Sequence, residues 1–127
     1  MSDAISWAAE SPDVPGGAKH ALAEALAAAP SDPRAIAATH GLSCALPGAF
    51  IVALAIASKP EYNYIQAARA NLMAGGDSAS RANVVGALKA AQEGGVPEGW
   101  AAKVLKRDEL EDDVEKLVGA RGTAATA

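Results

Sequence analysis

The stretch PGAFIVALAIAS, residues 47–58, is the part of the sequence that says most about the fold. Its large apolar residues occupy every side of a helix: Phe50, Ile51, Val52, Leu54 and Ile56. A helix that is apolar all round belongs in the middle of a helical assembly. We therefore expect a buried central helix at about residues 47–58. Few other segments are long and apolar enough to cover it, which suggests that a missing N-terminal half or a partner chain completes the core.

Helical segments are predicted on both sides of this stretch. Apolar residues at helical spacing, bounded by proline and glycine, predict helices at 18–29, from Pro33, at 61–73, at 77–93, after Pro97 and at 109–118. Alanine, the best helix former, fills 33 of the 127 positions, and aromatic residues are rare. The predicted fold class is all-α. We expect one helical domain over residues 1–118 and a flexible tail over residues 119–127.

The opening segment and one of the predicted helices carry finer predictions. Residues 1–17 contain closely spaced prolines and glycines, so no long helix is expected there. In the predicted helix at 61–73, the stripe formed by Tyr64, Ala68 and Leu72 is expected to line one face.

Charge and composition exclude several classes of protein. The formal net charge is −4 and the basic residues are scattered, which is not the clustered basic face of a nucleic-acid binder. The most apolar stretch, residues 45–57, is shorter than the roughly 20 residues that cross a bilayer. The single cysteine, Cys44, excludes an intramolecular disulfide and a cysteine-rich zinc site. We expect a cytoplasmic protein with neither a nucleic-acid nor a membrane partner.

The loop Gly75-Gly76-Asp77 is the one chemically distinctive feature, because it opens directly onto a predicted helix. Asp77 could simply cap that helix, since an N-terminal carboxylate accepts backbone amides and suits the helix dipole. Alternatively, Asp77 and the hydroxyl of Ser80, three residues later, could offer oxygen ligands to Mg²⁺. Arg81 could face an anionic ligand or pair with a surface acid. The two glycines would let the backbone approach a ligand closely.

A cysteine–histidine pair is the other candidate that the sequence suggests. His40 precedes Cys44 by four residues. The apolar surroundings of Cys44 favour an inert, buried thiol over a catalytic one, because reactive thiols lie in electropositive settings. We therefore predict no catalytic residue here.

Two stretches together resemble the ADP-ribosylglycohydrolase family. Residues 71–100, NLMAGGDSASRANVVGALKAAQEGGVPEGW, look like its C-terminal motif region, with a Gly-Gly-Asp turn, a Gly-Ala-Leu step, a glycine stop, a Val-Pro and a tryptophan. Residues 43–50, SCALPGAF, resemble the entry to a central helix in the same family. The order and spacing of the two matches agree with the family over about residues 41–105.

The resemblance implies a C-terminal helical segment of a longer all-helical fold. It also implies a cleft in which Mg²⁺ or Mn²⁺ ions help water to cleave ADP-ribosyl links to protein side chains. Asp77 falls on a metal-ligand aspartate and Ser80 on a hydroxyl ligand. The implied ligand-contacting residues around them are Gly75, Gly76, Ser78 and Arg81. The implied partners are ADP-ribose or an ADP-ribosylated protein.

Two departures from the family pattern weaken the implied metal centre. Ala79 stands where the second aspartate is expected, and the family's N-terminal Thr-Asp-Asp cluster is absent. Two dications about 4 Å apart repel by roughly 17 kcal/mol at an effective dielectric near 20, which one aspartate cannot offset. We expect a weak or incomplete Mg²⁺ site and no useful hydrolysis by this chain alone. A non-catalytic family relative, such as a crystallin-like branch, and a helical interaction module are the alternatives.

Overall fold

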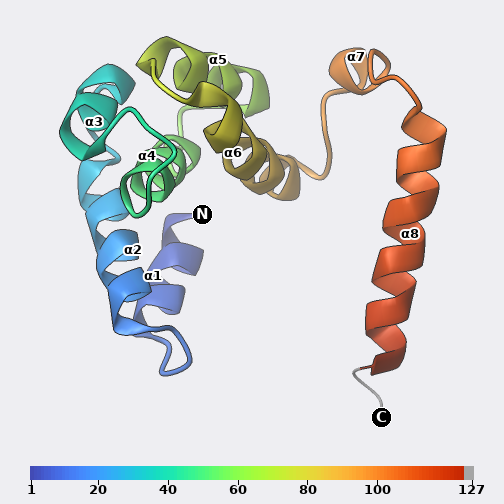
Figure 1. Cartoon of the computed structure of the whole chain (residues 1–127), viewed down its shortest axis with the longest axis horizontal. Helices are drawn as coiled ribbons and strands as arrows, with labels where there is room; N and C mark the ends of the chain where they lie inside the picture. Colours follow the sequence, from blue (N-terminus) through green and yellow to red (C-terminus); the bar gives the residue numbers. More distant parts are fainter. Residues whose placement is uncertain (125–127) are drawn as a thin grey trace. The chain divides into compact units, whose positions relative to one another are not determined.

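The computed structural model describes residues 1–124, and this part of the chain is entirely helical, with no β-strand (Figure 1). The prediction of an all-α fold is confirmed. The helices are α1 (Ser2–Glu10), α2 (Gly16–Ala28), α3 (Pro33–His40), α4 (Gly48–Ala57), α5 (Tyr64–Ala74), α6 (Ser78–Glu93), α7 (Glu98–Ala101) and α8 (Arg107–Ala124). The chain divides after Val96 into two compact units, the first with α1–α6 and the second with α7 and α8.

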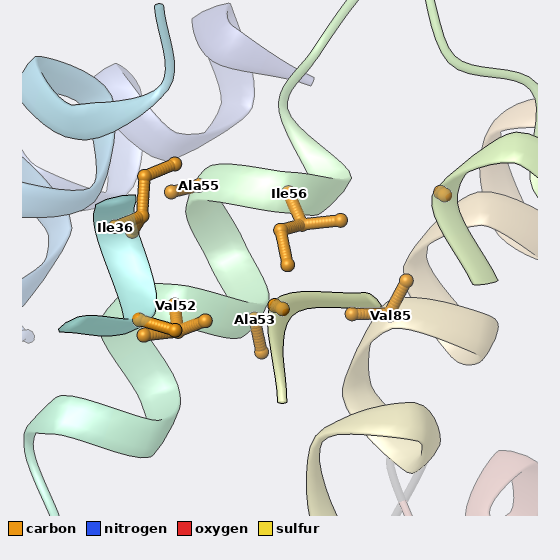
Figure 2. Close-up of a cluster of buried hydrophobic side chains, with 9 residues drawn as sticks. Ile36, Val52, Ala53, Ala55, Ile56 and Val85 are labelled. Carbon is orange, nitrogen blue, oxygen red and sulfur yellow. The ribbon is translucent and has the colours of Figure 1, made fainter. Parts of the chain in front are cut away.

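Helix α4 forms the centre of the first unit, as the sequence predicted. Residues 51–57 are all at most 5% exposed, and α4 packs against α2, α3, α5 and α6. One cluster of buried side chains joins α3, α4, α5 and α6, and Figure 2 shows Ile36, Val52, Ala53, Ala55, Ile56 and Val85 within it. A second cluster joins α4 to α1 and α2 through Ile51, Leu54, Ile5 and Leu22. The expectation that α4 lacks covering helices is wrong, because alanines let four neighbours approach it closely.

Capping residues place the ends of the helices. Asp32 accepts the amide of Arg34 at 2.9 Å and Pro33 supplies the first helical residue of α3. At the start of α5, Asn63 and Gln66 form a reciprocal capping box. Gly94 ends α6 in the left-handed conformation, with φ of +77°.

Several elements differ from the prediction. Helix α1 is a short helix of nine residues in the opening segment, for which only the absence of a long helix was predicted. It forms because the breaking residues begin only after Glu10 and because Ile5 is buried against α2. Helix α8 continues to Ala124, past the predicted end at 118. The expected tail beyond Ala124 lies outside the described residues.

The face of α5 that meets the core is also different from the predicted stripe. Ala67, Asn71 and Ala74 are buried, whereas Leu72 is 62% exposed. The apolar pattern pointed to the wrong side because a polar residue, Asn71, occupies the buried face.

None of the helices within residues 1–124 combines the length and the apolar character that a bilayer crossing requires.

Candidate functional site

The site begins with the turn Gly75-Gly76-Asp77, which joins α5 to α6 (Figure 1). Both glycines have positive φ, +79° and +67°, which side chains rarely adopt. Gly76 also lies against the backbone of Leu42: a Cβ on Gly76 would come within 2.2 Å of the Leu42 carbonyl oxygen. Asp77 donates its backbone amide to that same oxygen at 2.7 Å. Glycine is therefore required at position 76 for both conformation and space.

Asp77 is the N-cap of α6, as one of the two sequence interpretations predicted. Its Oδ1 accepts the backbone amide of Ser80 at 3.2 Å, and its Oδ2 accepts the Ser80 hydroxyl at 2.7 Å. These bonds, the hydroxyl first, hold the pKa of the Asp77 carboxyl below its ordinary value, and the positive charge of Arg81 acts in the same direction. The carboxylate is thus kept ionised at the N-terminus of α6.

Arg81 lies beneath the turn and is only 1% exposed. Its Nε donates to Asn71 Oδ1 at 2.9 Å, and its Nη2 donates to the carbonyl oxygen of Gly75. Asn71 in turn donates its Nδ2 to the carbonyl oxygen of Ser78 at 2.8 Å. Burial lowers the pKa of Arg81, and the nearby Asp77 opposes that shift. Neither sequence interpretation of Arg81, as a surface arginine or as a ligand contact, anticipated a buried one.

The structure brings together all six residues that the sequence singled out around this turn. They belong to one segment: Gly75, Gly76, Asp77, Ser78, Ser80 and Arg81. The sequence did not predict two further residues of the site, Leu42 and Asn71. Asn71 could have been noticed as a polar residue inside an otherwise helical apolar pattern, but nothing in the sequence links Leu42 to a turn more than 30 residues later.

The sequence model of the ADP-ribosylglycohydrolase family matches residues 1–126. The chain belongs to the ADP-ribosylglycohydrolase family. The match extends well beyond the motif region at 41–105 and includes α1–α3 and α8. A search of curated proteins and a search of solved structures each returned no significant match. Membership implies an ADP-ribosylglycohydrolase-like hydrolase as the general function.

The metal ions implied for an ADP-ribosylglycohydrolase are poorly matched by the ligands at this turn. Asp77 supplies one carboxylate, while the Ser80 hydroxyl donates its proton to that carboxylate. Ala79 offers no ligand, and the guanidinium of Arg81 adds a positive charge nearby. Among residues 1–124, no group of three or more His, Cys, Asp or Glu side chains is arranged to hold a metal ion. A pair of dications does not fit this set of ligands, since several anionic groups must offset their repulsion.

The structure describes both members of the cysteine–histidine candidate, Cys44 and His40. Cys44 is exposed, so the expectation of a buried thiol is wrong. His40 instead faces Glu24, with 3.7 Å between Nδ1 and Oε2, and the same carboxylate lies 3.0 Å from His20 Nε2. The contact of His40 with Glu24 joins the end of α3 to α2, whereas that of His20 lies within α2.

Proposed function

We propose that this chain contributes the C-terminal, ADP-ribose-facing part of an ADP-ribosylglycohydrolase-like protein and does not hydrolyse ADP-ribosyl links by itself. The observation that carries the proposal is the Gly75-Gly76-Asp77 turn, held against Leu42 and capping α6, in a chain that the family model matches. In the full protein, metal-assisted hydrolysis would need ligands that another part of the protein, or a partner chain, supplies.

ADP-ribose has chemical groups that the N-terminus of α6 can bind. The ligand has ribose hydroxyl groups, which can donate to the ionised carboxylate of Asp77. It also has a diphosphate, which the positive end of a helix of 16 residues attracts. At Gly75, where a Cβ would meet nothing within 4 Å, no side chain separates a ligand from the turn backbone. Ser78 is the first residue of the helix.

A single hydrated Mg²⁺ (or Mn²⁺) is the most that Asp77 and Ser80 could hold. Mg²⁺ commonly uses one or two carboxylates and retains several waters. Binding would require the Ser80 hydroxyl to turn its proton away from Asp77, so we expect weak affinity. Calorimetric titration of MgCl2 into the chain should show no tight site, whereas two tightly bound ions per chain would contradict the proposed incomplete site.

A hydrolysis assay tests the proposal directly. The purified chain is incubated with an ADP-ribosylated protein and Mg²⁺, and released ADP-ribose is quantified. We expect release at the background rate and, in a separate titration, measurable binding of free ADP-ribose. Multiple turnovers by this chain alone would refute the first part of the proposal, and absence of ADP-ribose binding would refute the second.

A non-catalytic family relative is the second candidate function. Ala79 favours it, because the position of the second metal-ligand aspartate carries no ligand. The pair of Asp77 and Ser80 also favours it, because the Ser80 hydroxyl already donates to the carboxylate instead of offering itself to a metal. The two candidates differ in the full-length protein: a hydrolase would regain activity when the complementary part is added to this chain, whereas a binding or structural relative would remain inactive.

A further inference from the structure

Arg81 and Asn71 form a buried polar pair beneath the turn that presents Asp77. Both side chains are 1% exposed. The guanidinium of Arg81 binds Asn71, in the last turn of α5, and the carbonyl oxygen of Gly75. Asn71 in turn binds the carbonyl oxygen of Ser78, the first residue of α6. These contacts lie on both sides of Asp77 in the chain.

Stability alone does not account for an arginine in this position. No carboxylate of the described residues lies within ion-pair distance of the guanidinium, and its Nη1 is buried without a hydrogen-bond partner among residues 1–124. Burying a charge in this way is costly, and apolar replacements of buried charged groups are often neutral or stabilising. A charged group that is buried at such a cost can instead serve to fix a particular conformation.

We infer that Arg81 and Asn71 are positioning residues, which lock the Gly75–Asp77 turn in the conformation that presents Asp77. Arginine suits this role because Nε and Nη2 lie in one plane and reach Asn71 Oδ1 and the Gly75 carbonyl oxygen simultaneously. A lysine ammonium is a single point of charge and cannot reproduce the two bonds in that geometry. The role of the pair in ligand binding rests on the proposed function, whereas its control of the turn does not.

Amide hydrogen exchange of the folded chain, followed by NMR, tests this inference. The informative amides are those of Asp77, which donates to Leu42, and of Ser80, which donates to Asp77. In Arg81→Lys we expect both amides to exchange at least about 10-fold faster, relative to the amide of Ser58 at the end of α4. A lysine that preserved slow exchange at the turn would overturn the inference, since charge alone would then suffice.

Lys89 provides a matched control on the same helix. It is 3% exposed and also donates to two backbone carbonyls, those of Lys59 and Tyr62, away from the turn. Lys89→Met should accelerate Asp77 and Ser80 no more than Ser58. Equal effects of Lys89→Met and Arg81→Lys at the turn would show that general destabilisation explains the result, and would overturn the inference.

A second variant guards against failure of Arg81→Lys to fold. Asn71→Asp keeps the shape of the side chain and an acceptor for Arg81, but loses the donor to Ser78. We expect a folded protein with faster exchange at Asp77 and unchanged exchange at Ser58; unchanged exchange at both would contradict the inference. Titration of ADP-ribose into wild type and Arg81→Lys then separates the two proposals. Faster exchange in the variants, together with a wild-type chain that binds no ADP-ribose, would sustain the positioning role and refute the proposed function.

Discussion

Asp77 has contacts on three sides, and each has a different consequence. Its backbone amide donates to the Leu42 carbonyl oxygen, and its carboxylate accepts two hydrogen bonds from Ser80. The positive charge of Arg81 lowers the pKa of the carboxyl. The helix-cap and ligand interpretations of Asp77 do not exclude each other, because a capped carboxylate remains ionised and keeps lone pairs for a further donor. A ligand measurement shows whether Asp77 does both.

Gly76 is the position in the turn where a side chain should be tolerated least. Gly76→Ala must adopt a φ of +67° and move the backbone of Leu42, so we expect a loss of about 2 kcal/mol or more in the free energy of unfolding. Urea denaturation measures it. The control is Gly17→Ala in α2, where a Cβ meets nothing within 4 Å and stability should be unchanged or raised. Equal stability of wild type and Gly76→Ala would show that the turn is not held as described.

Asp77 should also contribute to the acid sensitivity of the fold. Because its pKa is lowered in the folded state, its stabilising effect is complete above the ordinary value near 3.8 and is lost as the pH falls through the folded value. The stability difference between wild type and Asp77→Ala should therefore be largest near neutral pH and shrink below about pH 4. Urea midpoints measured across this range provide the test, and a difference that does not change with pH would contradict the hydrogen bonds to Ser80.

At the scale of single residues, the sequence predicted local features and missed distant ones. The cap at Asp77 and the stop at Gly94 depend on neighbours a few positions away, and both are confirmed. The contact of Gly76 with Leu42 and the burial of Arg81 against Asn71 depend on how helices pack, so no local pattern could reveal them.

Helix α4 shows how far composition determines an element. An all-round apolar helix must be buried, and this prediction is confirmed. Its partners were not predictable in the same way, because small residues on α2, α5 and α4 itself permit close contacts that a count of large apolar residues overlooks. The face of α5 was assigned wrongly for a related reason, since Asn71 is buried through a polar contact.

Truncation of Ile56 tests whether α4 is the centre of the core. Ile56 is 0% exposed, and Ile56→Ala should cost about 2–5 kcal/mol in the free energy of unfolding, because a cavity remains among its neighbours. The control is Leu46→Ala just before α4, where the side chain is 78% exposed and the change should stay within about 0.5 kcal/mol. Similar effects of the two substitutions would contradict the described core.

At the scale of the whole molecule, the two clusters of buried side chains come entirely from residues 1–96. The unit from Pro97 onward has contacts of its own, such as those of Arg107 with Glu98 and Glu111 at 2.8 and 2.6 Å. The family match includes both units and extends on both sides of the motifs at 41–105.

The division of the chain predicts that residues 1–96 fold without the rest. A chain ending at Val96 retains α1–α6 and both buried clusters, so it should unfold cooperatively on heating and remain helical by circular dichroism. A truncated chain that lacks a cooperative transition would show that the core extends beyond Val96.

The most direct test of the central claim is a calorimetric titration of ADP-ribose into three proteins: wild type, Asp77→Asn and Asp32→Asn. Asp32 caps α3 as Asp77 caps α6, so it controls for the loss of a capping carboxylate. The proposed function predicts binding by wild type and Asp32→Asn and at least about 10-fold weaker binding by Asp77→Asn, a difference of roughly 1.4 kcal/mol. Equal binding by all three proteins would reduce Asp77 to a helix cap and contradict the account of the turn as the ADP-ribose-facing site.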